Sequence, residues 1–533
     1  MKTIRQTLSS LFALMLCVGT AAAQNTTEIP VLDGEKWWGA FTAKGSQMPI
    51  SAPLDGLQPL SQQNFNNQNV PFLVSNYGRY IWSDEAFDFR YDGSKFVIEN
   101  TTKPVTVTKV GKNLREAFVL AAHDHFPANG TIPPELFFSV PQYNTWIELQ
   151  YNQNQADIEK YADDILANGF PAGILMVDDN WQRYYGNFDF KAERFPDPKG
   201  MIDRLHAKGF KVMLWISPFV SPDSPEFRDL QEKGYLIRQK GSRNAAIIPW
   251  WNGYSACYDL TNPAAFDHLL QTLKQAQAEY GIDGFKFDAG DLSFYHPESQ
   301  DYHDSTAHAT DHCMKWAELG SKFPYNEFRA CWKMQGLPLV QRLGDKDYSW
   351  NALQLLIPEM VNAGLMGYAY TCPDMIGGGQ VGSFRNVDQT KLDQALIVRS
   401  AQVHAMMPMM QFSVAPWRVL DKEHLACCLA AAKLHEKMAP YILELAHDAA
   451  ESGEPIVRSL EYMYPKQGFS DCSDEFMLGT RYLVAPILTP DGKRTVRLPR
   501  GTWIDDQGQK FKGPLVIEVS APIDRIPYYE LKR

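Results

Sequence analysis

Charged side chains follow an apolar segment near the middle of the chain, within the sequence GIDGFKFDAGD at residues 281–291. A short buried strand that ends at Lys286 and Asp288 brings charge to the carboxyl edge of a sheet, where barrel enzymes build their active sites. A carboxylate there suits glycoside hydrolysis, which needs one carboxyl group as nucleophile or base and another as proton donor. Considered alone, Asp288 fits equally well a residue that caps a turn.

Two other apolar segments also end in polar groups that could bind a sugar. Residues 172–177 run into Asp178 and Asp179, and residues 212–216 contain Trp215. If these strands are parallel members of one barrel, their ends converge on one face around one cavity. The alternatives are an N-cap role for the aspartates and a core-filling role for the tryptophan.

A second catalytic carboxyl group is harder to identify from the local sequence. Asp345 lies in the segment RLGDKD at residues 342–347, after a strand-to-loop region that begins near Phe328. A loop of glycine, lysine and aspartate is typical of a solvated turn. This segment alone therefore argues against a catalytic role for Asp345.

The elements that must position these residues alternate between strands and helices. Helical spacing of apolar residues predicts helices over 155–168, 201–207 and 264–280, and Gly281 ends the last of them. Strands are expected at 146–149, 172–177, 212–216 and just before Asp288. This alternation predicts an α/β fold with a parallel sheet, most economically a (β/α)8 TIM barrel over residues 142–445.

The flanking parts of the chain favour short strands separated by turn residues. Residues 24–141 are expected to form an N-terminal β-sandwich-like domain, and residues 446–533 a C-terminal β-sandwich domain. Residues 1–23 have a basic start, an apolar run and small residues before Gln24, which predicts a cleaved signal peptide and an exported protein, periplasmic or secreted. Cys17 follows the bulky Leu16, which argues against lipidation. No later segment is apolar for long enough to span a membrane.

Composition narrows the classes of partner. The 533 residues carry a formal net charge of −11 without a run of basic residues, which argues against nucleic acid and favours a neutral substrate. The 13 tryptophans and 24 tyrosines exceed what a core requires, and aromatic faces stack on sugar rings. The cysteines after Cys17 are odd in number and form no CxxC pair, so we expect buried thiols, no metal site and no cofactor. The oligomeric state is left open.

Taken together, the segments resemble glycoside hydrolase family 31, whose members are mostly retaining, exo-acting α-glycosidases. The similarity covers nearly the whole chain after residue 23, in order. It runs through GILMVDDNWQ (173–182), RFPDP (194–198), KVMLWISPF (211–219), YDLTNP (258–263), GIDGFKFDAGD, NAGLMGYAYTCPDMIGGG (362–379) and EFMLGTRYLVAPIL (475–488).

This resemblance implies roles for individual residues. Asp288 falls on the nucleophile, and the spacing back from Asp374, in the segment that matches the family's HDIGG, places Asp345 at the acid/base. The remaining positions imply sugar-hydroxyl ligands at Asp178 and Arg329, an aromatic wall of the −1 subsite at Trp215, and a lysine beside the nucleophile at Lys286. Pairing of Lys286 or Arg329 with Asp288 is expected to keep that carboxylate ionised, while Asp345 must be protonated to donate.

Two positions depart from the α-glucosidase and α-xylosidase branches, which commonly have tryptophan and histidine where this chain has Arg342 and Pro373. Asp179 adds an acid beside Asp178. These changes suggest a pocket for a different hydroxyl stereochemistry. The segments CPDMIGGG and PMMQFSVAPWR (408–418) resemble the branch that contains α-galactosidases and myogenesis-regulating glycosidase, so we expect hydrolysis of terminal α-galactosides.

Two alternatives remain. The same chemistry could act on α-glucosides, α-xylosides or another α-sugar, or the chain could be a silent sugar-binding protein on the same fold. The presence of both Asp288 and Asp345 argues against the silent protein, because binding alone needs neither a nucleophile nor a proton donor.

Overall fold

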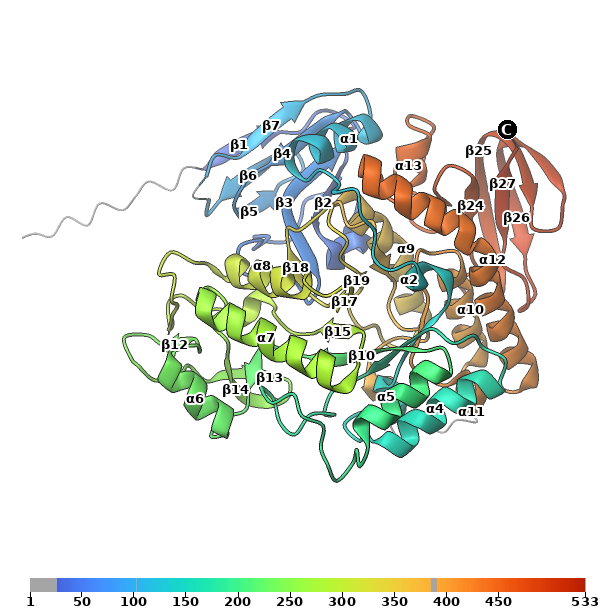
Figure 1. The fold of residues 1–533 in the computed structure, drawn as a ribbon. Helices are drawn as coiled ribbons and strands as arrows, with labels where there is room; N and C mark the ends of the chain where they lie inside the picture. The colour runs from blue at the N-terminus through green and yellow to red at the C-terminus, as the bar shows by residue number, and fades with distance from the viewer. Residues whose placement is uncertain (1–25, 102, 385–390, 533) are drawn as a thin grey trace, which may run out of the picture.

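The computed structural model describes residues 26–101, 103–384 and 391–532 (Figure 1). The predicted signal peptide, with its Cys17, lies outside these residues. Among the helices described, none is long and apolar enough to cross a membrane. The blue N-terminal strands, the green and yellow barrel elements and the red C-terminal sheet occupy separate parts of the molecule.

The N-terminal β-rich domain contains two sheets. Strands β1 (Thr27–Pro30), β6 (Lys95–Glu99) and β5 (Asp88–Tyr91) form an antiparallel sheet in that order. The second sheet contains β2 (Trp37–Phe41), β3 (Gln68–Ser75), β4 (Arg79–Trp82) and β7 (Thr106–Lys109), all antiparallel. The helical segments that follow these strands or lie among them are η1 (Thr42–Gln47), α1 (Leu114–His125) and α2 (Leu136–Ser139).

The middle of the chain forms an eight-stranded parallel sheet curled into a TIM barrel. Its strands, in spatial order, are β20 (Thr371–Cys372), β19 (Gln341–Arg342), β17 (Tyr325–Phe328), β15 (Gly284–Phe287), β10 (Lys211–Ile216), β9 (Ile174–Val177), β8 (Gln142–Asn144) and β21 (Gln411–Phe412). The two ends of the sheet approach one another, since the Ile376 amide donates to the Gln411 carbonyl at 2.8 Å.

Helices surround the barrel: α3 (Trp146–Leu149), α4 (Gln155–Ala167), α5 (Pro198–Ala207), α7 (Pro263–Tyr280), α8 (Ala309–Gly320), α9 (Trp350–Leu365), α10 (Gln394–Ala405), α11 (Pro416–Val419) and α12 (Lys422–Ser452). The residues at the helix ends favour the start and the end of a helix. In α7, the Asn262 side chain accepts from the Ala264 amide, Pro263 occupies the first turn, and Gly281 ends the helix at φ 79°. A left-handed backbone conformation costs glycine little free energy. The chain can therefore turn at Gly281 and enter β15 three residues later.

Strand β15 shows how the sequence directs apolar side chains outward and a charged one inward. Phe285 and Phe287 pack into the apolar layer under the helices, with Trp316 and Phe323. Because successive side chains of a strand point to opposite faces, Lys286 faces the barrel interior.

Between β10 and α7 the chain leaves the barrel and forms β11 (Phe219–Val220), α6 (Pro225–Lys233), β12 (Arg238–Gln239), β13 (Ile248–Trp250) and β14 (Gly253–Cys257). Strand β12 pairs with β16 (Gln300–Asp301), which follows η2 (Leu292–Phe294), and η3 (Val381–Ser383) follows β20. Between β17 and β19, β18 (Cys331–Trp332) leaves the barrel and pairs in parallel with β3 of the N-terminal domain.

The C-terminal β-rich domain is built on a six-stranded antiparallel sheet in the order β22-β23-β24-β27-β25-β26. Its elements are β22 (Val457–Arg458), α13 (Leu460–Met463), β23 (Phe476–Leu478), β24 (Tyr482–Val484), β25 (Lys493–Asp505), β26 (Lys510–Ser520) and β27 (Tyr528–Leu531). The predicted boundary after residue 445 falls inside α12, which continues to Ser452.

The barrel, the three predicted helices and the two flanking β-rich domains are confirmed, and one expected strand is wrong. Residues 146–149 form helix α3, whereas the first barrel strand is β8, which begins at Gln142 and ends at Asn144. The strand was missed because Gln142 and Asn144 are polar, although both are fully buried.

Candidate active site

Residues from adjacent barrel strands form a buried polar row across the sheet. Trp215 on β10 is in register with Lys286 on β15, which is in register with Glu327 on β17. All three are at most 4 % exposed. The strand geometry therefore directs these side chains into the barrel, below the acids that follow the strands.

Asp288 follows β15 and accepts a hydrogen bond at Oδ2 from the Trp215 indole N–H at 2.7 Å. Its Oδ1 accepts from the Ala289 amide at 3.0 Å and lies 3.8 Å from Arg329 Nε. Trp215 is only 1 % exposed, so it is a donor to the Asp288 carboxylate more than an open aromatic wall. These contacts fix the orientation of the carboxylate.

Lys286 pairs with a different acid from the one expected. Its Nζ lies 2.7 Å from Asp178 Oδ2, and both side chains are almost completely buried. The expected pairing of Lys286 with Asp288 is therefore replaced by pairing with Asp178, because the two side chains meet across the barrel interior from β15 and the end of β9. Arg329 is the cationic side chain that pairs with Asp288, with its Nε 3.8 Å from Asp288 Oδ1.

Asp179 belongs to a separate hydrogen-bonded cluster. Its Oδ2 accepts from Asn252 Nδ2 at 2.6 Å, and its Oδ1 accepts from the Tyr185 hydroxyl at 3.1 Å. The side-chain Oδ1 of Asn252 in turn accepts from the Tyr151 hydroxyl at 2.7 Å. Burial, together with the nearby charge of Asp178, raises the pKa of Asp179 to about 7. This carboxyl group can therefore act as donor or acceptor near neutral pH.

Asp345 is held by Arg342, the residue that departs from the common family pattern. Arg342 Nη1 lies 2.8 Å from Asp345 Oδ1 and 2.9 Å from Asp374 Oδ1. Burial alone would raise the pKa of Asp345, but the charges of Arg342, Arg329 and Lys286 outweigh burial and lower it. This arrangement favours the carboxylate form of Asp345, whereas donation to a leaving group needs the protonated form.

Asp374 is a further buried acid of the site. Besides Arg342, it accepts from the amides of Lys346, Met375 and Gly379 at 2.6–3.0 Å. A Cβ on Gly379 would lie 2.6 Å from Asp345 Oδ1 and 3.0 Å from Asp374 Oδ1. Position 379 therefore requires glycine, because any side chain there would collide with both carboxylates.

Arg329 connects Asp288 to the N-terminal domain. Its Nε lies 3.2 Å from Asp291 Oδ2, and the Asp291 Oδ1 accepts from Asn64 Nδ2 at 3.3 Å. The guanidinium also lies over the ring of Trp251, 4.9 Å from its centroid. Arg329 is therefore fixed from two sides while staying beside Asp288.

Sequence reasoning missed several residues of this site. Asp291 lies in the same GIDGFKFDAGD segment, so its signal was present. Asn252 and Trp251 occupy the turn between β13 and β14, where Asn-Gly indicates only a hairpin. Asn64 and Tyr185 carry no recognisable local signal.

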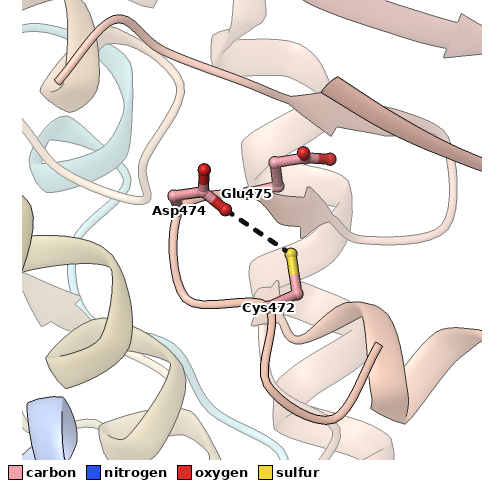
Figure 2. Close-up of side chains that lie close together, drawn as sticks. All are labelled: Cys472, Asp474 and Glu475. Atoms are coloured by element: carbon pink, nitrogen blue, oxygen red, sulfur yellow. Dashed lines mark hydrogen bonds between the residues drawn. The ribbon is translucent and has the colours of Figure 1, made fainter. Parts of the chain in front are cut away.

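A different cluster lies in the C-terminal domain, far along the chain from the barrel acids. Cys472, Asp474 and Glu475 bring ligand-type atoms together (Figure 2). Arg494 lies 3.2 Å from both carboxylates, and Arg497 lies 3.0 Å from Asp474. Burial raises the pKa of the Cys472 thiol to about 12. These arginines oppose a cation, so the cluster is an ion-pair group in which Glu475 alone is buried. All seven described cysteines are free and mostly buried, as predicted.

Two models of one protein family match most of this chain. Residues 131–445 match the family model for the glycosyl hydrolases family 31 TIM-barrel domain, and residues 453–530 match that family's C-terminal domain. The chain belongs to glycoside hydrolase family 31. The matched region contains every barrel residue of the candidate site, whereas Asn64 lies outside it.

Individual relatives agree with this membership. The chain is 31 % identical to myogenesis-regulating glycosidase of Mus musculus over 424 residues, which cover 78 % of this chain and 59 % of the relative. It is 25 % identical to alpha-xylosidase XylQ of Lactiplantibacillus pentosus over 480 residues, covering 84 % and 60 %. The chain thus spans about three fifths of the length of these curated relatives.

The fold is shared with solved structures. A Flavobacterium johnsoniae GH31 dextranase complexed with glucose superposes with a TM-score of 0.81 at 20 % identity, covering 95 % of this chain and 66 % of that one. At this identity the likeness concerns the fold alone.

Proposed function

We propose that this protein is a retaining, exo-acting α-glycosidase that hydrolyses terminal α-galactosides. The observation that carries the chemistry is a pair of acids that follow two strands of one barrel. Asp288 follows β15 and is oriented by Trp215, and Asp345 follows β19, which is separated from β15 only by β17. Two carboxyl groups on one barrel face are what a two-step displacement requires.

Asp288 is the nucleophile in this proposal. Its carboxylate attacks the anomeric carbon, the glycosidic bond breaks, and Asp345 gives its proton to the leaving oxygen. Water then attacks the glycosyl-enzyme ester while Asp345 takes up a proton, which restores both acids. The lowered pKa of Asp345 means that its contact with Arg342 must weaken before donation.

The galactose specificity rests on the cluster around Asp179. A galactoside differs from a glucoside in the orientation of the C4 hydroxyl, and a buried polar group left unpaired by the wrong epimer rejects it strongly. Asp179 and Asn252 are such groups, and Lys286 with Asp178 lies beside them. The similarity to myogenesis-regulating glycosidase and the substitution of Arg342 and Pro373 support the same branch of the family.

A panel of p-nitrophenyl α-glycosides tests the proposal. The α-galactoside should be cleaved far faster than the α-glucoside or α-xyloside, and an NMR time course should show the α-anomer as the first product. Preference for another sugar would reject the galactose assignment alone, and a β-anomer as first product would reject retention. Turnover of no glycoside would support a silent sugar-binding protein.

Two variants separate the acids in the same assay. Asp288→Ala should abolish turnover of every substrate, because no glycosyl-enzyme forms. Asp345→Ala should lose much more on substrates with poor leaving groups than on activated aryl glycosides, and azide should partly restore it. Equal losses on both classes would count against Asp345 as the acid.

A further inference from the structure

The turn between β13 and β14 presents a tryptophan at the site. Trp250 and Gly253 are paired, so Trp251 and Asn252 form the turn, and Gly253 follows with φ 100°. A two-residue turn followed by a glycine in this conformation makes a rigid hairpin end. Trp250 anchors it, since it is 9 % exposed and packs edge-on against Tyr185 at 4.8 Å.

Both residues of this turn contact side chains of the candidate site. The Asn252 amide donates to Asp179 at 2.6 Å, on the side assigned to the glycone. The Trp251 ring packs on the guanidinium of Arg329 at 4.9 Å, and Arg329 lies 3.8 Å from Asp288. The hairpin therefore bridges the glycone cluster and the point of bond cleavage.

Trp251 is nevertheless 44 % exposed, unlike the other aromatic residues of the site. Arg329 covers part of the ring, while Trp250 and Phe294 support it at centroid distances of 5.1 and 6.1 Å. Leaving this much apolar surface in water is unfavourable. The Trp251 ring, held in place beside Arg329, can instead stack on the apolar face of a sugar.

We propose that Trp251 is the platform for the first sugar of the aglycone, the pyranose joined to the terminal residue that is removed. The substrate class is then a terminal α-glycoside linked to another sugar, in preference to a small or flexible alcohol. This inference rests on the proposed glycosidase function. Arg329, under the same ring, is placed to donate to a hydroxyl near the linkage.

The test compares substrates with and without an aglycone ring. Turnover of α-galactosyl fluoride, whose leaving group is one atom, is measured beside α-galactosyl disaccharides with 1→3, 1→4 and 1→6 linkages. Trp251→Ala should lower kcat/KM for the preferred disaccharide about tenfold more than for the fluoride, the loss expected for one stacked aromatic contact. Trp251→Tyr should recover much of the difference.

Tyr254 gives a matched control, because it is 67 % exposed on the same hairpin. Tyr254→Ala should leave the ratio of the two substrates unchanged. Equal losses on fluoride and disaccharide for Trp251→Ala would overturn the platform and show that Trp251 acts only through Arg329. No loss on either would also overturn it.

The design separates this inference from the proposed function. If the wild type prefers α-glucosyl fluoride, the galactose assignment fails and the same ratio is measured in the glucosyl series. If no fluoride is turned over, the glycosidase proposal fails, and calorimetric titration of the wild type with the disaccharides tests the platform alone. Weaker disaccharide binding by Trp251→Ala supports the platform, and equal binding rejects it.

Discussion

Asp179 is the residue on which the galactose specificity depends most directly. Loss of a charged hydrogen bond to the substrate should lower kcat/KM for α-galactosides by about 100-fold in Asp179→Asn or Asp179→Ala. Steady-state kinetics on aryl α-galactosides checks this. Glu193→Gln, an exposed acid on a nearby loop, is the control and should be silent. A nearly silent Asp179→Ala would reject the galactose assignment and leave the retaining mechanism untouched.

Arg342 controls the charge of the proposed acid Asp345. Its guanidinium keeps the pKa of Asp345 low, so the protonated form that donates is present only at low pH. Removing the positive charge in Arg342→Gln should raise this pKa and move the alkaline limb of the kcat/KM profile to higher pH. A pH profile on an unactivated galactoside measures the shift.

The direction in which the alkaline limb moves decides whether Arg342 sets the pKa of Asp345. A limb that stays in place, or moves to lower pH, would show that Arg342 does not set the pKa of Asp345. Arg342→Lys keeps the charge but not the forked geometry, so it should leave the limb closer to that of the wild type.

At the scale of elements, strand β15 is fixed by a close approach to β17. A Cβ on Gly284 would lie 1.8 Å from the Tyr325 carbonyl oxygen. Gly284→Ala must therefore push apart two central strands, and the free energy of unfolding should fall by more than about 2 kcal/mol. Chemical denaturation measures this. Gly382→Ala, where a Cβ would meet open space and the backbone is not left-handed, is the control and should lose less.

Long elements could be predicted from the sequence because their signals are local. Helix α7 has an Asn cap, a proline in its first turn and a terminal glycine, and β15 alternates between outward Phe and inward Lys. Strands β19, β20 and β21 span two residues each, too few for any pattern. Their identity depends on the closure of the barrel, which no local segment specifies.

The residues of the site also fall into two groups, those with a signal in the local sequence and those without one. Asp288 and Asp178 are visible as acids after apolar strands, whereas Asp345 emerged only through the resemblance to a family. The charge state of Asp345 and the partner of Lys286 could not be predicted, because they depend on side chains that meet across the barrel. The contribution of Asn64 comes from another domain.

At the scale of the molecule, the N-terminal domain completes the site. Asn64 donates to Asp291, which holds Arg329, and Gln68 Nε2 donates to the Arg329 carbonyl at 3.1 Å. Asn64→Ala should lower kcat/KM about tenfold, because Arg329 loses part of its support, with a stability loss of only about 1 kcal/mol. Kinetics and thermal unfolding check the two effects. Gln62→Ala, exposed on the same loop, should change neither.

The parallel pairing of β18 with β3 has a consequence for the order of synthesis. Gln68 and Arg329 are 261 residues apart, so β3 is synthesised long before β18, the strand that completes its sheet. At roughly 5–20 residues per second the delay is on the order of tens of seconds. During that interval the Gln68 end of β3 has unpaired amide and carbonyl groups, a template for intermolecular association. This edge is covered only after residues 331 and 332 have been synthesised and have paired with it.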